Sequence, residues 1–183
     1  VNQGRKAFQQ AVANDTQHPD AYYQLALSYV FPSRDYNRAM SIFYKQLSVN
    51  PGHRDALSHL GKCSFLTKQY RVGVDLLQQL MDTHGDALPT YSKTLMAQLK
   101  ASLLQEEREY DKAAELYDEF IEGLDPAEKI FYTELKYVAN EQEMAAYEQA
   151  TDSEKQEIAR KFWGSRDPDP ATVVNERLVE HYR

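Results

Sequence analysis

The stretch YNRAMSIF at residues 36–43, followed by Pro51, recurs as YRVGVDLL at residues 70–77, followed by Gly85. Four positions return after the same interval of 34 residues: Tyr36 as Tyr70, Ala39 as Gly73, Phe43 as Leu77 and Pro51 as Gly85. A repeat of this length is typical of stacked helix pairs, which point to a binding scaffold before they point to an enzyme. The sequence therefore predicts an all-α protein built from repeated helix pairs.

A further helix is expected before each repeated stretch, with Leu25-Ala26 in the first copy and Leu60-Gly61 in the second. Small residues let two helix axes approach closely, while Leu, Phe and Tyr side chains fill the gaps between neighbouring pairs. This pattern resembles that of the tetratricopeptide repeat (TPR) family. The resemblance implies a right-handed α-solenoid of antiparallel helix pairs, here with a C-terminal helical extension.

The resemblance divides the chain into TPR repeats over residues 1–124 and a helical segment over residues 125–183. Within the first part we expect a half repeat over about residues 2–18 and full repeats over about residues 19–51, 52–85 and 86–124. The third repeat departs from the spacing, because Tyr70 and Tyr110 lie 40 residues apart. Its first helix, or the loop before that helix, is therefore longer. Leu99 and Ala101 are alternatives for its small-residue position.

Composition limits the classes of partner. With 27% charged and 42% hydrophobic residues, the 183-residue chain is globular rather than disordered. The sequence has no apolar run long enough to cross a membrane, and residues 1–5 lack the apolar core of a signal peptide, so no membrane insertion is predicted. The net charge of −7 and the scattered Lys and Arg residues argue against nucleic acid as a ligand.

Residues that could carry chemistry are sparse. Cys63 is the only cysteine, which excludes an internal disulfide, and its place two residues after Gly61 favours a buried structural thiol. His59 lies four residues before it on the same helical face, but the five histidines show no metal-ligand spacing. The sequence also lacks a nucleophile elbow, a phosphate loop and a dinucleotide-binding turn. We therefore expect no enzyme activity, no cofactor and no metal.

Two helical stretches are predicted after Gly123. Composition predicts helix over residues 126–149, where Asp125 caps the start and Pro126 occupies the first turn. The apolar stripe of this stretch is Ile130, Phe131, Leu135, Val138, Met144 and Tyr147. Thr151 or Ser153 is then expected to cap a helix that ends at Gly164.

The run FWGSRDPDP at residues 162–170 is followed by Asn175-Glu176 and by EHYR at residues 180–183. In order and spacing, these residues resemble the segment that precedes the namesake motif of bacterial GWxTD-domain proteins. The motif residues are Phe162, Trp163, Arg166, Asp167, Pro168, Asn175, Glu176 and His181. The resemblance implies that the chain is part of a larger bacterial protein in the cell envelope, periplasmic or exported, with the cytoplasm as the alternative.

The motif residues favour a structural role over a ligand site. Arg166 is expected to hydrogen-bond carbonyl groups at the end of its helix or to pair with Glu176. Trp163 is expected to bury its ring against the next helix.

The TPR resemblance also implies a concave groove lined by the first helix of each repeat. Its residues are Asp20, Tyr23, Leu27, Val30, Phe31, Asp55, Ser58, Lys62, Phe65 and Leu66. An aromatic and apolar wall suits an extended or helical peptide with apolar anchors. We therefore expect a non-catalytic protein–protein interaction scaffold that binds a protein or peptide, with the missing C-terminal part of its own parent chain as one candidate. The alternative is the docking or regulatory half of an enzyme whose catalytic domain lies beyond Arg183.

Overall fold

The computed structural model describes residues 2–31 and 33–183, and it confirms the all-α, repeat-like architecture: this part of the chain is helical and contains no strand. The chain forms two compact units, residues 1–100 and residues 101–183. Their boundary falls within helix α6 (Tyr91–Glu106). The division of the repeats at residue 124 stays a prediction, and its first residue, Val1, lies outside the described residues.

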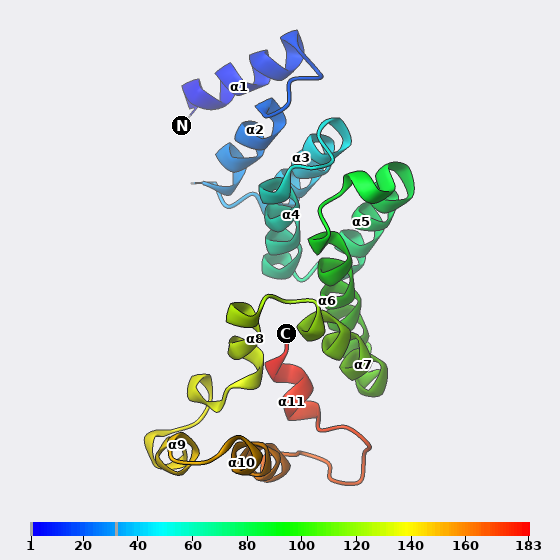
Figure 1. The fold of residues 1–183 in the computed structure, drawn as a ribbon. Coiled ribbons are helices and arrows are strands. Elements are labelled where there is room, and N and C mark those ends of the chain that lie inside the picture. The colour runs from blue at the N-terminus through cyan, green and yellow to red at the C-terminus, as the bar shows by residue number, and fades with distance from the viewer. Residues whose placement is uncertain (1, 32) are drawn as a thin grey trace. The chain divides into compact units, whose positions relative to one another are not determined.

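The N-terminal unit consists of consecutive helices joined by short turns (Figure 1). They are α1 (Asn2–Asn14), α2 (Ala21–Val30), α3 (Tyr36–Val49), α4 (Arg54–Thr67), α5 (Tyr70–His84) and the 3-10 turn η1 (Gly85–Ala87), followed by the first part of α6. The helix α3 packs against α2, α4 and α5, and α1 packs against α2. The unit is therefore held together by contacts between helices that are near neighbours in the sequence.

The turn that leads into the second helix of a pair recurs in the backbone. Arg34, Lys68 and Arg108 are the non-glycine residues with a left-handed φ in the described part of the chain, at 52°, 54° and 62°. Each stands two residues before the first residue of a helix: Tyr36 of α3, Tyr70 of α5 and Tyr110 of α7 (Tyr110–Glu122). The backbone thus repeats at intervals of 34 and then 40 residues, as the sequence does.

Two of these turns also share their hydrogen bonds. The Gln69 N–H donates to the Ser64 carbonyl at 3.0 Å and the Lys68 N–H to the Phe65 carbonyl at 3.2 Å. The turn at Arg108 has the same pattern: the Glu109 N–H donates to the Leu104 carbonyl at 2.9 Å and the Arg108 N–H to the Gln105 carbonyl at 3.1 Å. A left-handed residue at this position satisfies carbonyl groups that would otherwise be left free at the helix end.

Small residues occupy the close approaches between helices, as the sequence predicts. Ala26 and Ala39 are fully buried. A Cβ atom built on Gly61 would lie 2.7 Å from a methyl carbon of Leu95, and one on Gly73 would lie 2.6 Å from Ser64 Oγ. The glycines therefore allow α4 and α5 to contact neighbouring helices over their backbones.

The C-terminal unit contains the end of α6 and a series of shorter helices. They are α7, α8 (Pro126–Thr133), the 3-10 turn η2 (Leu135–Tyr137), α9 (Glu141–Glu148), α10 (Asp152–Gly164) and α11 (Glu176–His181). The helix α10 packs against α9, and the chain returns through α11 to pack against α7 (Figure 1). Leu135, Tyr147 and Phe162 form a buried cluster that joins η2, α9 and α10.

The predicted helical stretch over residues 126–149 is interrupted in the structure. The helix α8 ends at Thr133, and Asn140 starts α9 with a capping box in which its side chain accepts the N–H groups of Gln142 and Glu143. Phe131 and Val138 are 52% and 38% exposed, so they do not belong to a buried stripe. The cap at Thr151 is confirmed: its side chain accepts the Glu154 N–H, and α10 ends at Gly164.

Cys63 is buried among the helices of the N-terminal unit, which confirms the prediction of a buried thiol. Burial raises the pKa of the thiol to about 11, because the thiolate loses its hydration. We expect the native protein at pH 8 to react with an aromatic disulfide reagent at least about a hundredfold more slowly than the urea-unfolded chain. Absorbance of the released thiolate measures both rates, and equal rates would contradict the prediction.

Candidate functional site

The first candidate site lies where the beginnings of α2 and α4 meet. We call it the α2–α4 surface and define it by Asp20, Tyr23, His53 and His59. His53 Nδ1 accepts the Ala56 N–H at 3.2 Å, so the ring proton is on Nε2 and is donated to Asp20 Oδ1 at 3.0 Å. This hydrogen bond lowers the pKa of the Asp20 carboxyl group. The residues just before the two helices are therefore tied together.

Tyr23 is the centre of a group of rings on this surface. Its ring centroid lies 4.6 Å from that of His53 and 5.7 Å from that of His59. Phe43 of α3 lies beneath it, at 5.9 Å from Tyr23 and 5.3 Å from His59, and is fully buried. Tyr23, His53 and His59 are half-buried, so one side of each ring is packed and another is open to solvent.

A buried glutamine fixes the start of α2 beneath these rings. Gln46 of α3 is fully buried; its Oε1 accepts the Tyr23 N–H at 2.8 Å, and its Nε2 donates to the Pro19 carbonyl at 2.6 Å. The first N–H groups of a helix have no partner within the helix, and here a neighbouring helix supplies one. The backbone that carries Tyr23 is therefore held in a defined position.

The other predicted groove residues differ in exposure. Phe31 directly follows α2 and is 68% exposed, and Leu66 near the end of α4 is 63% exposed. Asp55 and Lys62 are also exposed, while Leu27, Ser58 and Phe65 are half-buried. Val30 is buried, so in this conformation its side chain packs inside the unit and does not face a groove.

Sequence reasoning did not include His53 and His59 among the groove residues. Their scattered spacing gives no ligand pattern, and the pairing of His53 with Asp20 depends on the side-by-side placement of α2 and α4. One signal was present: Asp20 and His53 each stand directly before the first residue of a helix, at equivalent points of successive pairs.

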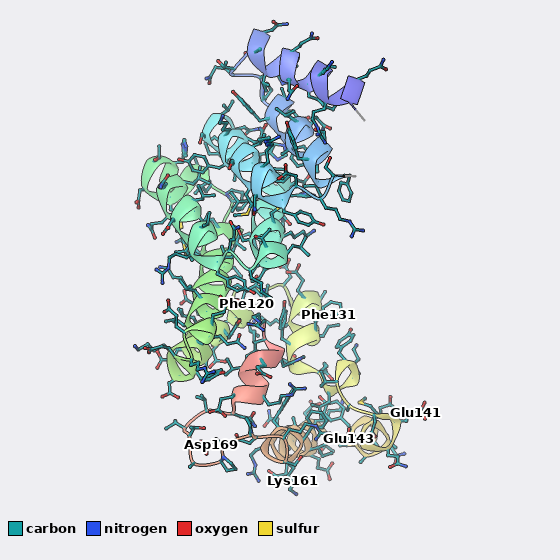
Figure 2. All side chains as sticks on the ribbon, turned by 180° about the vertical axis from the view of Figure 1, so that it is seen from behind. Phe120, Phe131, Glu141, Glu143, Lys161 and Asp169 are labelled. Atoms are coloured by element: carbon teal, nitrogen blue, oxygen red, sulfur yellow. The ribbon has the colours of Figure 1, made fainter. Side chains whose placement is uncertain are left out.

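The second candidate site is a hollow of about 480 Å³ in the C-terminal unit, which we call the α10–α11 hollow. Its lining residues are Val138, Phe162, Trp163, Arg166, Arg177, Glu180, His181 and Arg183. Four of the predicted motif residues, Phe162, Trp163, Arg166 and His181, are thus brought together here. Figure 2 labels Glu143 of α9, which pairs with one of the lining arginines.

Arg166 connects α9 to the end of α10. Its Nη2 forms an ion pair with Glu143, its Nη1 donates to the Phe162 carbonyl at 3.0 Å, and its guanidinium carbon lies 3.6 Å from the centroid of the Phe162 ring. The expected bond to a carbonyl at the helix end is confirmed. The acidic partner, however, is Glu143 and not Glu176, because Arg166 extends toward α9.

The remaining motif residues hold the connection to α11. Asn175 Nδ2 donates to the Trp163 carbonyl at 2.6 Å, and its Oδ1 accepts the Leu178 N–H at 3.0 Å. Asp167 accepts the Asp169 N–H, Pro168 is exposed, and Glu176 accepts a hydrogen bond from Thr172. These four residues do not line the hollow, and their contacts are those of a structural connection.

Trp163 and His181 form a stacked pair on the wall of the hollow. Their ring centroids lie 5.1 Å apart at an angle of 32°, so Trp163 packs against the next helix as the sequence predicts. Burial lowers the pKa of His181, although a hydrogen bond to the Tyr132 backbone opposes this effect. His181 Nε2 is buried and has no hydrogen-bond partner.

The described residues contain no group of three His, Cys, Asp or Glu side chains placed to hold a metal ion. None of the helices in residues 2–31 and 33–183 combines the length and the apolar character that a bilayer crossing requires. Comparison of the chain with models of protein families gave no match, and comparison with curated protein sequences also gave none.

Proposed function

We propose that this chain is a non-catalytic interaction scaffold of the TPR type, and that its α2–α4 surface binds a segment of a partner protein. The observation that carries the proposal is the position of Tyr23. Its half-exposed ring packs against His53 and His59, and the buried Gln46 holds its backbone N–H. A large ring that is already ordered loses little conformational freedom on binding, which is why tyrosine is frequent among residues that dominate interface energies.

The exposed apolar side chains add to this argument. Phe31 and Leu66 are among the large hydrophobic residues that are exposed to solvent. Phe31 directly follows α2, and Leu66 lies near the end of α4. Half-exposed rings at the beginnings of the two helices and apolar anchors at their ends suit a peptide that lies along a helical groove. Lys62 and Asp55, both exposed, give the surface no strong charge of either sign.

The assignment to the TPR type rests on the recurrence of the helix pair. Small residues at helix contacts and the left-handed turns at Arg34, Lys68 and Arg108 support it. The proposal that the chain is part of a bacterial GWxTD-type protein in the cell envelope rests on the resemblance of residues 162–183 alone. Residues that follow the segment in a longer protein would then be candidates for the partner.

Substitution of Tyr23 tests the proposed surface. Peptides selected for binding to the intact chain from a random displayed library are expected to bind the Tyr23→Ala variant at least about tenfold more weakly, because removal of a central aromatic anchor typically costs about 2 kcal/mol or more. Isothermal titration calorimetry with one synthetic peptide measures the change. Phe65→Ala is expected to weaken the same peptide to a smaller extent.

The matched control is Tyr44→Ala, which removes a tyrosine from α3 whose hydroxyl donates to Gln79. This variant should bind the selected peptide with unchanged affinity. The proposal is wrong if Tyr23→Ala and Tyr44→Ala bind equally well while circular dichroism shows that both are folded.

A further inference from the structure

We propose that the α10–α11 hollow is a second binding site, and that its ligand is an acidic peptide segment. A carboxylate of this segment would bind Arg177 and Arg183. The site is independent of the α2–α4 surface, since all of its residues belong to the C-terminal unit.

The hollow has an ordered aromatic wall. Phe162 and Trp163 meet edge to face with ring centroids 5.0 Å apart. The guanidinium of Arg166 lies over the Phe162 ring, and the ring of His181 packs against that of Trp163. Phe162 is buried, while Trp163 is half-buried and therefore partly open to the hollow. The wall is thus fixed by packing before any ligand arrives.

Charge favours an anionic ligand. Three arginines and one glutamate line the hollow, and because Arg166 is already paired with Glu143, Arg177 and Arg183 are the arginines that can bind a ligand. The pair of Arg177 with Glu180, 2.9 Å apart, spans three residues of one helix, and both side chains are substantially exposed. Such a pair contributes little free energy, so Arg177 can exchange Glu180 for a carboxylate of a ligand. Arg183 is exposed and forms no ion pair in the described part of the chain.

His181 closes the wall of the hollow beside Trp163. Its Nε2 atom is buried and has no hydrogen-bond partner. Because that atom is covered by the protein, His181 shapes the wall and offers the ligand no hydrogen bond. The polar contacts to a ligand therefore come from the arginines.

An apolar patch adjoins the hollow on the side of η2. Val138 lines the hollow and is partly exposed, and it directly follows Tyr137. Tyr137 of η2 and Phe131 of α8 are both exposed, and their ring centroids lie 4.8 Å apart. Figure 2 labels Phe131. The expected ligand is therefore an acidic segment that also carries an apolar residue.

Trp163 is the only tryptophan of the chain, so its fluorescence reports on this site. The probe is the blocked hexapeptide Gly-Asp-Glu-Leu-Glu-Gly, titrated into the full chain at low salt. We expect a saturable change in emission. The matched peptide with Asn and Gln in place of the three acidic residues should bind at least about tenfold more weakly.

Two variants and one control locate the binding. Arg177→Gln and Arg183→Gln are each expected to weaken the acidic peptide about tenfold, because each removes a guanidinium that would hold the carboxylate. Arg160→Gln alters an exposed arginine of α10 that pairs with Glu157 and does not line the hollow, so its affinity should be unchanged.

Several results would overturn the proposal. One is the absence of a saturable signal at millimolar peptide, and another is equal affinity for the acidic and the amide peptide. Inorganic phosphate that displaces the peptide at equal concentration would indicate a general anion site. A change in Trp163 emission that depends only on protein concentration would indicate that a second copy of the chain occupies the hollow.

Discussion

Replacement of Phe43 by alanine is expected to lower the free energy of unfolding of the N-terminal unit by about 3–5 kcal/mol. Phe43 has no exposed surface, and its ring contacts the rings of Tyr23 and His59. Truncation removes buried apolar surface and leaves a cavity, because the surrounding helices relax only in part. The same change withdraws the support beneath Tyr23, so peptide binding to the α2–α4 surface should weaken together with stability.

Urea unfolding followed by far-ultraviolet circular dichroism measures this loss. Trp163 fluorescence, recorded in parallel, reports on the C-terminal unit and should change less if the two units unfold separately. Tyr44→Ala is the matched control, since the neighbouring Tyr44 is half-buried and its hydroxyl bond lies at the surface; a loss of about 1 kcal/mol or less is expected. A loss for Phe43→Ala no larger than that control would contradict the described core.

Much of the N-terminal unit follows from the repeated sequence. Positions 39 and 73 predict close helix contacts, and the tyrosines at 36, 70 and 110 mark the first residues of α3, α5 and α7. These features could be predicted because a repeat fixes the helix period and the small-residue positions together. The ambiguity between Leu99 and Ala101 has a simple origin: both are fully buried, although residues two apart lie on nearly opposite sides of a helix, so α6 is packed on both of these sides.

The turns between helices were harder to predict. Lys68 and Arg108 adopt a left-handed conformation at helix ends, where glycine is the usual residue. Their side chains give no sign of this conformation, which is imposed by the hydrogen bonds that close the helix. In the C-terminal segment, the composition of residues 126–149 favours helix throughout. The end of α8 at Thr133 and the cap at Asn140 could therefore not be predicted from it.

The candidate sites depended on contacts between distant residues. Arg166 pairs with Glu143 across 23 positions, and His53 pairs with Asp20 across 33. A sequence pattern identifies the residues at a helix end but does not identify the side chain that a neighbouring helix presents to them. The buried and unpaired His181 Nε2 is likewise a property of packing, because it depends on how the ring lies against Trp163 of the preceding helix.

Gly73→Ala is expected to destabilise the protein by about 1–3 kcal/mol, although alanine is the better helix former. A Cβ atom at position 73 would lie 2.6 Å from Ser64 Oγ, 3.0 Å from Ser64 Cβ and 3.3 Å from a methyl carbon of Leu99. Ser64 is fully buried, and its hydroxyl donates to the Leu60 carbonyl at 3.0 Å, so its side chain cannot rotate away without the loss of that bond. The helices must therefore move apart, which costs more than the gain in helix propensity.

The substitution of Gly4 by alanine separates the effect of helix propensity from the effect of the close contact between helices. Gly4 lies within α1, and a Cβ atom there would have no neighbour within 4 Å, so Gly4→Ala is expected to leave stability unchanged or to raise it by up to about 1 kcal/mol. The double variant Ser64→Ala with Gly73→Ala should regain part of the loss, because it removes the closest atom, and a double-mutant cycle measures the coupling. If Gly73→Ala is as stable as Gly4→Ala in urea unfolding, α4 and α5 do not approach as closely as the repeat requires, and the assignment of positions 39 and 73 to helix contacts fails with it.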